Sequence, residues 1–426
     1  MTLETLDKRA FIAMDGDQPR PLIGLARLMR MAFAGEDLAP VGERLLARSR
    51  SHPDEANTLL DLSTVLQLRG NTEVALNVQD LALRTRPLFH LPAATAEPGL
   101  RLLVLMGPGD LMANTPVEFL LEQSDVELFM LYLAPGRPFP ESVPEHDVVF
   151  VAVAESERNL PLLARLESYL EHWPRPLLNA PGRIARLSRD GVLALFGDAP
   201  GLALPAVARA DRSGLERLAR GESAVDALLE GGAFPLIIRP IDSHAGHGLE
   251  KLDDAAALGA YLETAAEEGF YLSNFVDYRD ADGMFRKCRI VLIEGRPYVC
   301  HMAISEHWMI HYLNAGMAES AEKRAEEARF MADFDEGFAR RHAQAFRAIH
   351  ERAGLDYLGI DCGETPEGEL LIFEVDSCMI VHAMDPVDLF PYKQPQMRKV
   401  FDAFRGMLER AFRAWEAIPP PGAGMP

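Results

Sequence analysis

The sequence has 426 residues, of which 48% are hydrophobic and 25% charged, so it is long enough for two or three domains with cores of their own. It contains 43 Lys and Arg residues against 64 Asp and Glu residues. The resulting net charge of -21 excludes a general affinity for nucleic acid or anionic membranes, which requires clustered positive charge.

The sequence shows no pattern that predicts a signal peptide or a transmembrane helix. No run of 18 apolar residues occurs, and the opening MTLETLDKRAFIAMDGD carries acids where a signal peptide has basic and then apolar residues. The four cysteines show no CxxC spacing, and we interpret them as small buried hydrophobic residues in a reducing compartment. We therefore expect a cytoplasmic protein.

The first 95 residues are expected to be helical. Residues 56–87 carry apolar positions at helical spacing in two short blocks, broken by Gly70 and closed by Pro87, which predicts a helical hairpin. The small residues of this stretch stand where a tetratricopeptide repeat needs close helix approach, and residues 22–53 repeat the pattern loosely. We assign 1–95 to a tetratricopeptide-like region, with an ordinary helical cap on the next domain as the alternative.

Residues 96–200 show the alternation of a parallel sheet flanked by helices. The linker LPAATAEPG precedes a buried strand, LRLLVLM, and strand patterns VELFMLYLA, HDVVFVAVA and PRPLLNAPG then alternate with helical patterns. The segment is thus expected to form a Rossmann-like α/β domain. Its first loop, GPGD, lacks the GxGxxG spacing and is not interpreted as a dinucleotide site.

Residues 201–415 form the third predicted domain, and 416–426 a flexible tail. The strand FPLIIRP ends at Arg239 and Pro240, and LEKLDDAAALGAYLETA after it has a helical pattern. The small residues of SHAGHG, between them, let backbone N–H groups wrap a phosphate, and a helix N-terminus would add partial positive charge. One long helix is expected over residues 318–350.

Three carboxylates are predicted to converge near the end of this domain. In GIDCGETPEGELLIFEVDS, the turn TPEG makes the flanking strands antiparallel neighbours. Alternation along the second strand places Glu374 and Asp376 on one face, and Asp361 on the first strand can join them. Such a cluster repels itself unless a cation neutralises it, and oxygen ligands favour Mg²⁺ or Mn²⁺. The alternative is a solvated acidic sheet edge.

A second patch, CHMAISEHWMIHYLNAGM, contains three histidines. His307 and His311 are four residues apart, a spacing that puts two ligands on one face of a helix, but no Glu follows His307 as a zinc protease would require. With His301 and Asn314 they could bind a carboxylate or serve as a base. Ordinary core histidines are the alternative.

The order of these motifs resembles the ATP-grasp superfamily over roughly residues 100–400. The sequence has, in this order, a strand ending in a cation, a small-residue loop, a second strand pair, and then Asp followed by Glu-x-Asp. This order is similar to the pattern of glutathione synthetase and of the ribosomal-protein glutamate ligases. The resemblance implies an α+β ATP-grasp domain preceded by the Rossmann-like domain, next to the all-α helical region.

The resemblance also implies roles for individual residues. Arg239 matches the cation at the nucleotide phosphates, and Arg289 matches the arginine that begins the next strand in the ribosomal-protein glutamate ligases. The metal ligands correspond to Asp361, Glu374 and Asp376. Asn274, Phe275 and Val276 match the adenine hinge, and Asp277 the ribose contact. The phosphate loop corresponds to Ser243, His244, Ala245, Gly246, His247 and Gly248.

Three positions depart from the family pattern. Arg239 stands where lysine is usual, and Asp376 stands where asparagine is usual and adds a negative charge. The second phosphate-binding lysine is missing because Gly191 follows Asp190, so Arg186 or Arg189 is expected to substitute.

From the resemblance we expect an ADP-forming carboxylate–amine ligase that uses ATP and Mg²⁺ or Mn²⁺, with His307 and His311 on the acceptor side. Amino acids or a peptide are the expected substrates, and residues 1–95 could hold a protein partner. The alternative is an ATP-grasp adaptor that has lost turnover. The substrates and the oligomeric state stay open, although similar enzymes are commonly dimers.

Overall fold

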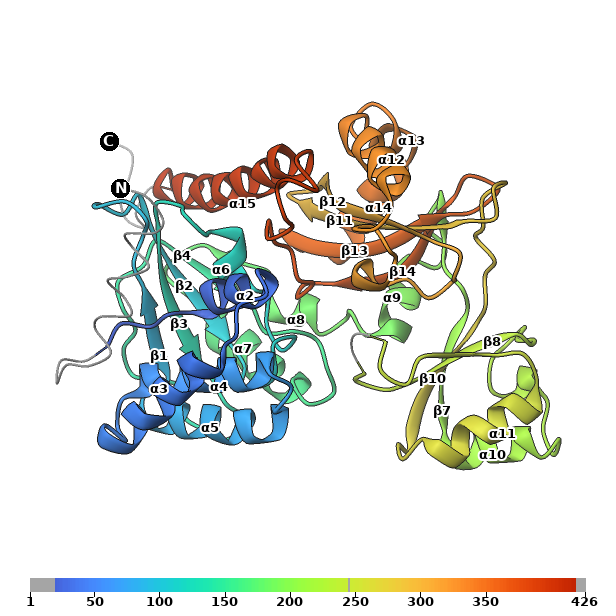
Figure 1. Cartoon of the computed structure of the whole chain (residues 1–426), viewed down its shortest axis with the longest axis horizontal. Helices are drawn as coiled ribbons and strands as arrows, with labels where there is room; N and C mark the ends of the chain where they lie inside the picture. The colour runs from blue at the N-terminus through green and yellow to red at the C-terminus, as the bar shows by residue number, and fades with distance from the viewer. Residues whose placement is uncertain (1–19, 244–245, 419–426) are drawn as a thin grey trace, which may run out of the picture. The chain divides into compact units, whose positions relative to one another are not determined.

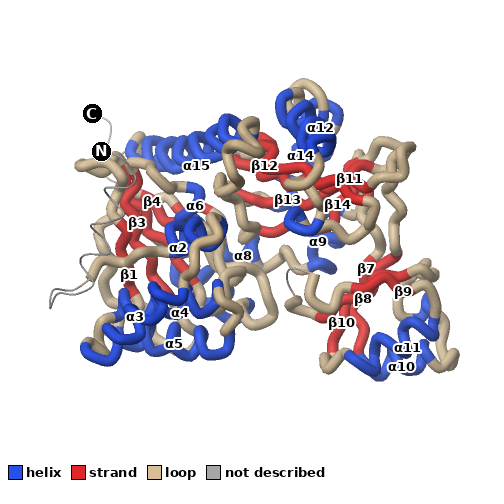
Figure 2. Tube along the Cα trace, viewed as in Figure 1, coloured by secondary structure: helices blue, strands red, loops and turns tan. Residues whose placement is uncertain are grey.

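The computed structural model describes residues 20–243 and 246–418. Their contacts divide them into two compact units (Figures 1 and 2). The first unit consists of the described residues up to 154, 159–182 and those from 377 onward; the second consists of 155–158 and 183–376. The mixed α/β class is confirmed, whereas the predicted boundaries at 95, 200 and 415 fall inside these units and stay predictions.

Two further predictions concern the whole chain. The four cysteines are buried and free of disulfides, as expected. Among the described residues, no helix combines the length and the apolar character that crossing a membrane requires. The acidic opening and most of the predicted flexible tail lie outside the described residues.

The first unit is built on a sheet of order β1-β3-β2-β4-β5. Strands β2, β3, β4 and β5 are parallel, as predicted, and the unpredicted β1 joins antiparallel to β3. The central strands are apolar and buried on both faces, which is typical of parallel sheets covered by helices. Their bounds are β1 Leu88–Leu91, β2 Leu100–Met106, β3 Val126–Tyr132, β4 Val148–Val151 and β5 Leu177–Leu178.

The predicted helical hairpin of this unit is confirmed. Helices α4 (Ala56–Leu68) and α5 (Thr72–Thr85) are joined at Gly70, which has φ +79°. The Ser63 hydroxyl donates to the Ala75 carbonyl oxygen at 2.7 Å, so the small residues do allow close approach. The tetratricopeptide relationship stays a prediction. The other helices here are α2 Leu25–Phe33, α3 Ala39–Ser51, α6 Val117–Leu120, α7 Leu160–Leu170 and α15 Lys393–Glu416.

The second unit contains an antiparallel sheet of order β7-β10-β8-β9. Leu215 of α10 and Leu258 of α11 belong to one buried apolar cluster with Phe270 of β10, and Figure 1 shows both helices beside this sheet. The bounds are β7 Val207–Asp211, β8 Leu236–Pro240, β9 Glu250–Leu252, β10 Gly269–Asn274, α10 Arg212–Ala219 and α11 Ala255–Thr264.

One prediction about this sheet is wrong. The residues directly after the SHAGHG loop form strand β9, which pairs antiparallel with β8, and the helix begins only after Asp254, whose carboxylate accepts from the Ala257 N–H at 2.8 Å. The loop therefore connects two strands and is not followed by a helix N-terminus. Backbone pairing with β8 outweighs the helical pattern of residues 250–252.

The second sheet of this unit has the order β12-β11-β13-β14-β6. The predicted antiparallel pair is confirmed as β13 and β14, with Asp361 directly opposite Glu374 and Gly359 opposite Asp376. The bounds are β6 Leu202–Ala203, β11 Phe285–Ile293, β12 Arg296–Ser305, β13 Tyr357–Glu364 and β14 Leu370–Asp376.

The prediction of a single long helix over residues 318–350 is wrong. The segment forms three helices, because the chain turns where Phe330, Phe334 and Phe338 pack their rings within 6.1 Å of one another. These are α12 Ala321–Ala332, α13 Phe338–Arg341 and α14 Ala343–Ala353. Short helices elsewhere are α8 Pro181–Ile184, α9 Arg189–Phe196, and the 3-10 turns η2 Val225–Ala227 and η3 Tyr312–Asn314.

Candidate active site

A buried carboxylate with two cationic partners lies at the centre of the site. Asp361, 1% exposed, is on β13 opposite Arg289 of β11. Arg289 donates from Nε to Oδ1 at 2.8 Å and from Nη2 to Oδ2 at 3.0 Å, and Lys287 Nζ lies 2.8 Å from Oδ2. Burial alone would raise the pKa of the Asp361 carboxyl, but the two cations outweigh it and hold that pKa far below its usual range.

Glu374 is the neighbour of Asp361 on β14 and has a cationic partner of its own. Arg189, the first residue of α9, donates to Glu374 Oε1 at 2.7 Å and to the Phe373 carbonyl oxygen at 3.0 Å. Burial opposes ionisation of Glu374, yet Arg189 and Arg239 lower its pKa. Arg189 is one of the two residues predicted to replace the missing lysine, and it is the one that reaches these carboxylates.

Arg239 adds a fourth positive charge. Its guanidinium donates to the Ser243 hydroxyl at 3.2 Å and to the Ser243 carbonyl oxygen. Burial and the neighbouring Arg189 lower the pKa of Arg239 to about 10, so it remains charged at neutral pH. Four cationic side chains thus lie around Asp361 and Glu374: Lys287, Arg289, Arg189 and Arg239.

A carboxyl group with a raised pKa lies near Asp376 and Asp242. Burial, together with nearby Asp242 and Asp376, raises the pKa of Glu155 to about 7. Asp242 Oδ1 also accepts from the Glu157 N–H at 3.2 Å. The site therefore includes a carboxyl that can hold a proton near neutral pH, a property suited to acid–base work.

The predicted metal site can be tested against these contacts. Asp361, Glu374 and Asp376 present oxygen donors that suit Mg²⁺, and strand register puts them on one face of the sheet. However, both oxygens of Asp361 are engaged by Arg289 and Lys287. No group of three or more acidic, histidine or cysteine side chains in the described part of the chain is arranged to hold a metal. As they lie, the residues do not fit a metal site, and the Mg²⁺ assignment stays a prediction.

A second network holds Arg189 in place. Its chain neighbour Asp190 accepts from Arg209 Nε at 3.0 Å and from the Tyr271 hydroxyl at 3.2 Å. Arg209 and Tyr271 are register partners on β7 and β10, and Tyr271 pairs in turn with Arg239 on β8. The first two residues of α9 therefore link the two sheets of this unit: Arg189 contacts β14, and Asp190 contacts β7 and β10.

The predicted phosphate loop lies against this cluster. Gly246 has φ +74°, and a Cβ on it would lie 2.5 Å from Nε2 of His311, so a side chain at this position would collide with that ring. Gly248, with φ +64°, is fixed by its carbonyl oxygen, which accepts from the Tyr261 hydroxyl at 2.8 Å. His247 is exposed, and His244 and Ala245 lie outside the described residues.

The predicted adenine hinge follows β10. The Phe275 N–H already donates to the Pro235 carbonyl oxygen at 3.1 Å, and the Phe275 ring lies 5.9 Å from that of Trp308. Asn274 Oδ1 accepts from the Ala233 N–H at 3.3 Å. Asp277 pairs with Arg279, which lowers its pKa. The Phe275 ring is thus an apolar surface at the predicted hinge, and the roles of Asn274 to Asp277 stay predictions.

Of the three histidines predicted on the acceptor side, His311 lies within the electrostatic influence of Lys287, Asp361 and Arg289. Burial and Lys287 lower the pKa of its ring, which is therefore neutral at pH 7. His307 donates its N–H to the Ser305 hydroxyl, and the chain from 306 to 311 is not helical, so the spacing argument for one helix face does not apply. His301 packs its ring 4.7 Å from Tyr312, and the side-chain oxygen of Asn314 accepts from the His311 N–H.

Several residues of the site were missed by the sequence reasoning. Lys287 stands two residues before Arg289, so strand alternation could have placed both on one face. Glu155 directly follows an apolar strand pattern, a place where polar residues of α/β units commonly act. Tyr271 and Arg209 gave no signal, because their roles come from pairing between strands far apart in the sequence.

Comparison with known proteins gives structural similarity only. No protein-family model matches the sequence, and neither does any curated protein. D-alanine–D-alanine ligase from Bacillus anthracis, complexed with ATP, aligns with a TM-score of 0.44 and 11% identity, covering 76% of this chain and all of that one. VanG D-Ala:D-Ser ligase from Enterococcus faecalis gives 0.46 and 15%, covering 72% and 99%.

A third similar structure is a RimK domain ATP-grasp protein from Sphaerobacter thermophilus. It aligns with a TM-score of 0.39 and 16% identity, covering 74% of this chain and 99% of that one. At such scores and identities, any functional assignment depends on the side chains of this chain's own site.

Proposed function

We propose that the chain is an ATP-dependent ligase that joins a carboxylate to an amine and releases ADP and phosphate. The observation that carries this proposal is the group of four cationic side chains around Asp361 and Glu374, beside a loop of small residues. Four fixed positive charges suit the oxygens of a triphosphate, because guanidinium and ammonium groups form strong charge-assisted hydrogen bonds with phosphate.

The chemistry has two steps. An oxygen of the substrate carboxylate attacks the γ-phosphorus, the bond to the bridging oxygen breaks, and ADP leaves an acylphosphate behind. The amine nitrogen then attacks the acyl carbon, phosphate departs, and the nitrogen loses a proton. Arg189 and Arg239 would stabilise the charge on the transferring phosphoryl group, as cations do in phosphoryl transfer.

His311 suits the proton transfer in the second step. Its ring is neutral at pH 7 because burial and Lys287 lower its pKa. A neutral imidazole accepts a proton, and its position against Gly246 puts it beside the loop that would cover the acylphosphate. Closing that loop would exclude water from an intermediate that water destroys.

A second candidate function is supported by the ion pairs themselves. Because Asp361 is already neutralised by Arg289 and Lys287, the site could bind a nucleotide as an adaptor without turnover. In that case the helices before residue 95 would hold the protein partner. Binding and turnover must therefore be measured separately.

Calorimetry with ATP, in the presence and absence of Mg²⁺, tests the first step. We expect the wild type to bind and Arg239→Met to weaken binding about tenfold or more, since one charge-assisted contact is lost. Arg352→Met is the matched control, because that arginine pairs with the exposed Asp198. If Glu374→Ala removes a Mg²⁺ dependence of the wild type, the metal prediction gains support.

Release of ADP with a panel of amino acids then separates the two candidates. Turnover that is lost in His311→Ala supports the ligase. ATP binding without ADP release for any acceptor supports the adaptor, and failure of the wild type to bind ATP contradicts both.

A further inference from the structure

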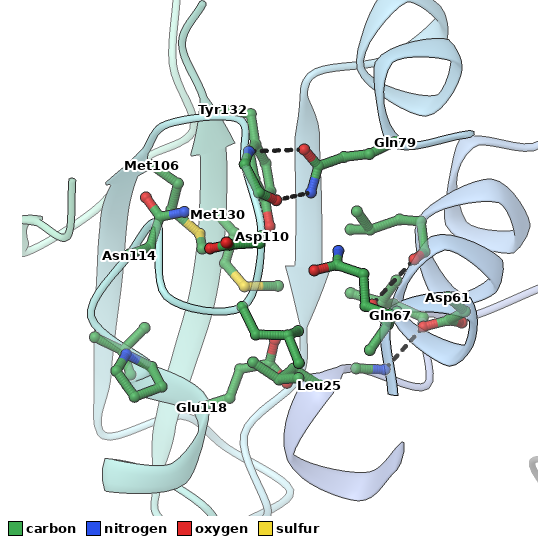
Figure 3. A pocket seen from close by; sticks show the side chains of 18 of the residues that line it. Leu25, Asp61, Gln67, Gln79, Met106, Asp110, Asn114, Glu118, Met130 and Tyr132 are labelled. Atoms are coloured by element: carbon green, nitrogen blue, oxygen red, sulfur yellow. Dashed lines mark hydrogen bonds between the residues drawn. The ribbon is translucent and has the colours of Figure 1, made fainter. Parts of the chain in front are cut away.

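The first unit contains a pocket that the proposed ligase chemistry does not use. It lies between α2, α4 and α5 on one side and the ends of β2 and β3 on the other, and has a volume of about 50 Å³ (Figure 3). A water molecule needs about 10 to 15 Å³ of such space, so the pocket has room for several waters or one small molecule.

The wall of the pocket is held rigid by two side-chain amides. Gln79 of α5 forms a pair of hydrogen bonds with Gly109, accepting from its N–H and donating to its carbonyl oxygen, both at 2.9 Å. Asn114 does the same for Gly107, at 2.7 and 2.8 Å. The loop after β2 is thereby fixed at both ends over the pocket, which makes the pocket a preformed feature.

One hydrogen-bond acceptor in the pocket is unused. Oε1 of Gln67 on α4 is buried and has no hydrogen-bond partner among the described residues. Figure 3 shows the Gln67 amide extending toward the pocket, in the direction of Asp110 and Tyr132. A buried acceptor without a donor is costly, and a ligand or water that donates to it would remove the cost.

The electrostatics of the lining favour a positive ligand. Asp110, at the exposed rim, and Glu118, which accepts from the Ala26 N–H at 3.1 Å, both line the pocket, whereas no Lys, Arg or His residue of the described ranges does. Burial raises the pKa of Glu118 to about 7 although the N–H groups of Ala26 and Leu25 donate to its carboxylate and lower this pKa. Asp61 also lines the pocket, but Arg20 neutralises it.

The remaining lining is apolar or aromatic. Tyr132 at the end of β3 also lines the pocket, and Met106, Met130 and Leu25 form the apolar walls. A ligand that satisfies all of these surfaces has a charged nitrogen with several donors and a short hydrocarbon part. Anions do not match the negative charge of the lining, and large planar molecules do not fit the volume of the pocket.

We propose that this pocket binds a small organic ammonium ion. Its N–H groups would donate to Gln67 Oε1 and lie near the Glu118 and Asp110 carboxylates, and its carbon chain would pack on the two methionines. This proposal does not depend on the ligase assignment, since every group that it uses lies in the first unit.

The test is a titration of the full-length protein, labelled with ¹³C at the methionine methyl groups. Ethylammonium is the probe, ethanol is the neutral molecule of equal size, and Met106→Leu and Met130→Leu assign the signals. We expect saturable shifts of both methyls with ethylammonium only. Gln67→Leu should weaken binding about tenfold, the loss expected for a hydrogen bond to a charged group.

Two further variants make the test decisive. Gln344→Leu, at an exposed position of α14, is the matched control and should bind like the wild type. Glu118→Gln removes the charge, keeps an acceptor for the Ala26 N–H, and should also weaken binding about tenfold. ATP binding, measured on the same samples, reports separately on the ligase proposal.

Three outcomes would overturn the proposal. No saturable shift up to about 100 mM probe would mean that the pocket holds water only. An equal response to ethanol would show an apolar cavity without charge preference. Unchanged affinity in both Gln67→Leu and Glu118→Gln, in variants that remain folded under the conditions of the titration, would place the binding elsewhere.

Discussion

Asp361 in the second unit and Glu118 in the first are two carboxyl groups removed from most of the solvent, with opposite electrostatic surroundings. Asp361 has Arg289 and Lys287 within hydrogen-bond distance, and its pKa is far below the usual range. Glu118 receives backbone N–H groups but no cation from the described part of the chain, and its pKa rises to about 7. Burial raises both pKa values, so the partner alone decides the sign of the shift.

The difference separates two ways of using a buried acid. A paired carboxylate such as Asp361 stays ionised and fixes the position of its cations, which is what a phosphate-binding site needs. An unpaired one such as Glu118 takes up a proton or attracts a cation from outside, which is what a binding pocket needs. The following predictions test whether the contrast is real.

The largest effect is expected at the Asp361 pair. Arg289→Met should lower the free energy of unfolding by about 3 to 5 kcal/mol, because it removes the bidentate partner of a buried charge. Urea unfolding at pH 7 measures this. Arg352→Met removes a surface pair with Asp198 and should cost no more than about 1 kcal/mol.

A double variant separates pairing from packing. In Arg289→Met combined with Asp361→Leu, the buried carboxylate is gone and only the partly exposed Lys287 loses its partner. Part of the loss should therefore be recovered, since apolar replacements of buried pairs are often neutral. Equal stability of Arg289→Met and wild type would show that Lys287 alone compensates Asp361. One cation would then be enough to explain why the pKa of Asp361 is lowered and that of Glu118 is raised.

The next effect concerns pH. The Glu118 carboxyl has a pKa of about 7 in the folded chain, against 4.5 in the absence of burial. Between these values the folded state holds a proton that the unfolded state has released, so stability falls as pH rises from about 4.5 to 7. At 1.36 kcal/mol per pKa unit, the loss above pH 7 is at most about 3 kcal/mol.

Glu118→Gln should remove the part of this dependence that comes from Glu118, whereas the part from Glu155, whose pKa is also raised to about 7, should remain. The variant is expected to exceed the wild type in unfolding free energy at pH 8 but not at pH 4.5, as measured by urea unfolding across that range. Glu145→Gln, at an exposed side chain, is the control. Asp361 does not contribute a slope here, because a lowered pKa keeps its stabilisation constant above about pH 4. A wild-type curve that is flat over this range would contradict the raised pKa of Glu118.

Local patterns predicted much of the fold. The parallel strands after residue 100, the hairpin of α4 and α5, and the antiparallel pair β13 and β14 each follow from hydrophobic period and turn residues. Predictions failed where tertiary contacts overrode local preference: residues 250–252 pair with β8 in place of starting a helix, and the expected long helix breaks at a cluster of phenylalanines.

The site was predicted in the same uneven way. Alternation along β14 and the turn before it placed Glu374 beside Asp361 correctly. The resemblance named Arg289 and Arg189, but their pairing with these carboxylates could not be derived, because Arg289 is 72 residues from Asp361 and Arg189 is 185 residues from Glu374. The sequence pattern indicates that the converging carboxylates need positive charge nearby, but only the register between strands decides whether a metal or an arginine supplies that charge.

The smallest expected effect concerns the loop beside the paired carboxylates. Gly246→Ala and Gly283→Ala both put a side chain at positive φ, +74° and +80°, and each should cost about 1 kcal/mol of stability. Only the Cβ at 246 meets a neighbour, Nε2 of His311 at 2.5 Å, whereas the Cβ at 283 meets no atom within 4 Å.

The distinguishing measurement is therefore the titration of His311 by NMR. Burial and Lys287 lower its pKa in the wild type. A ring pushed out by the added methyl group gains solvent, so its pKa should rise toward the ordinary 6.5 in Gly246→Ala and stay lowered in Gly283→Ala. If the pKa is the same in both variants, the ring has room to yield without leaving the cationic cluster, and His311 is held there by more than its contact with the loop.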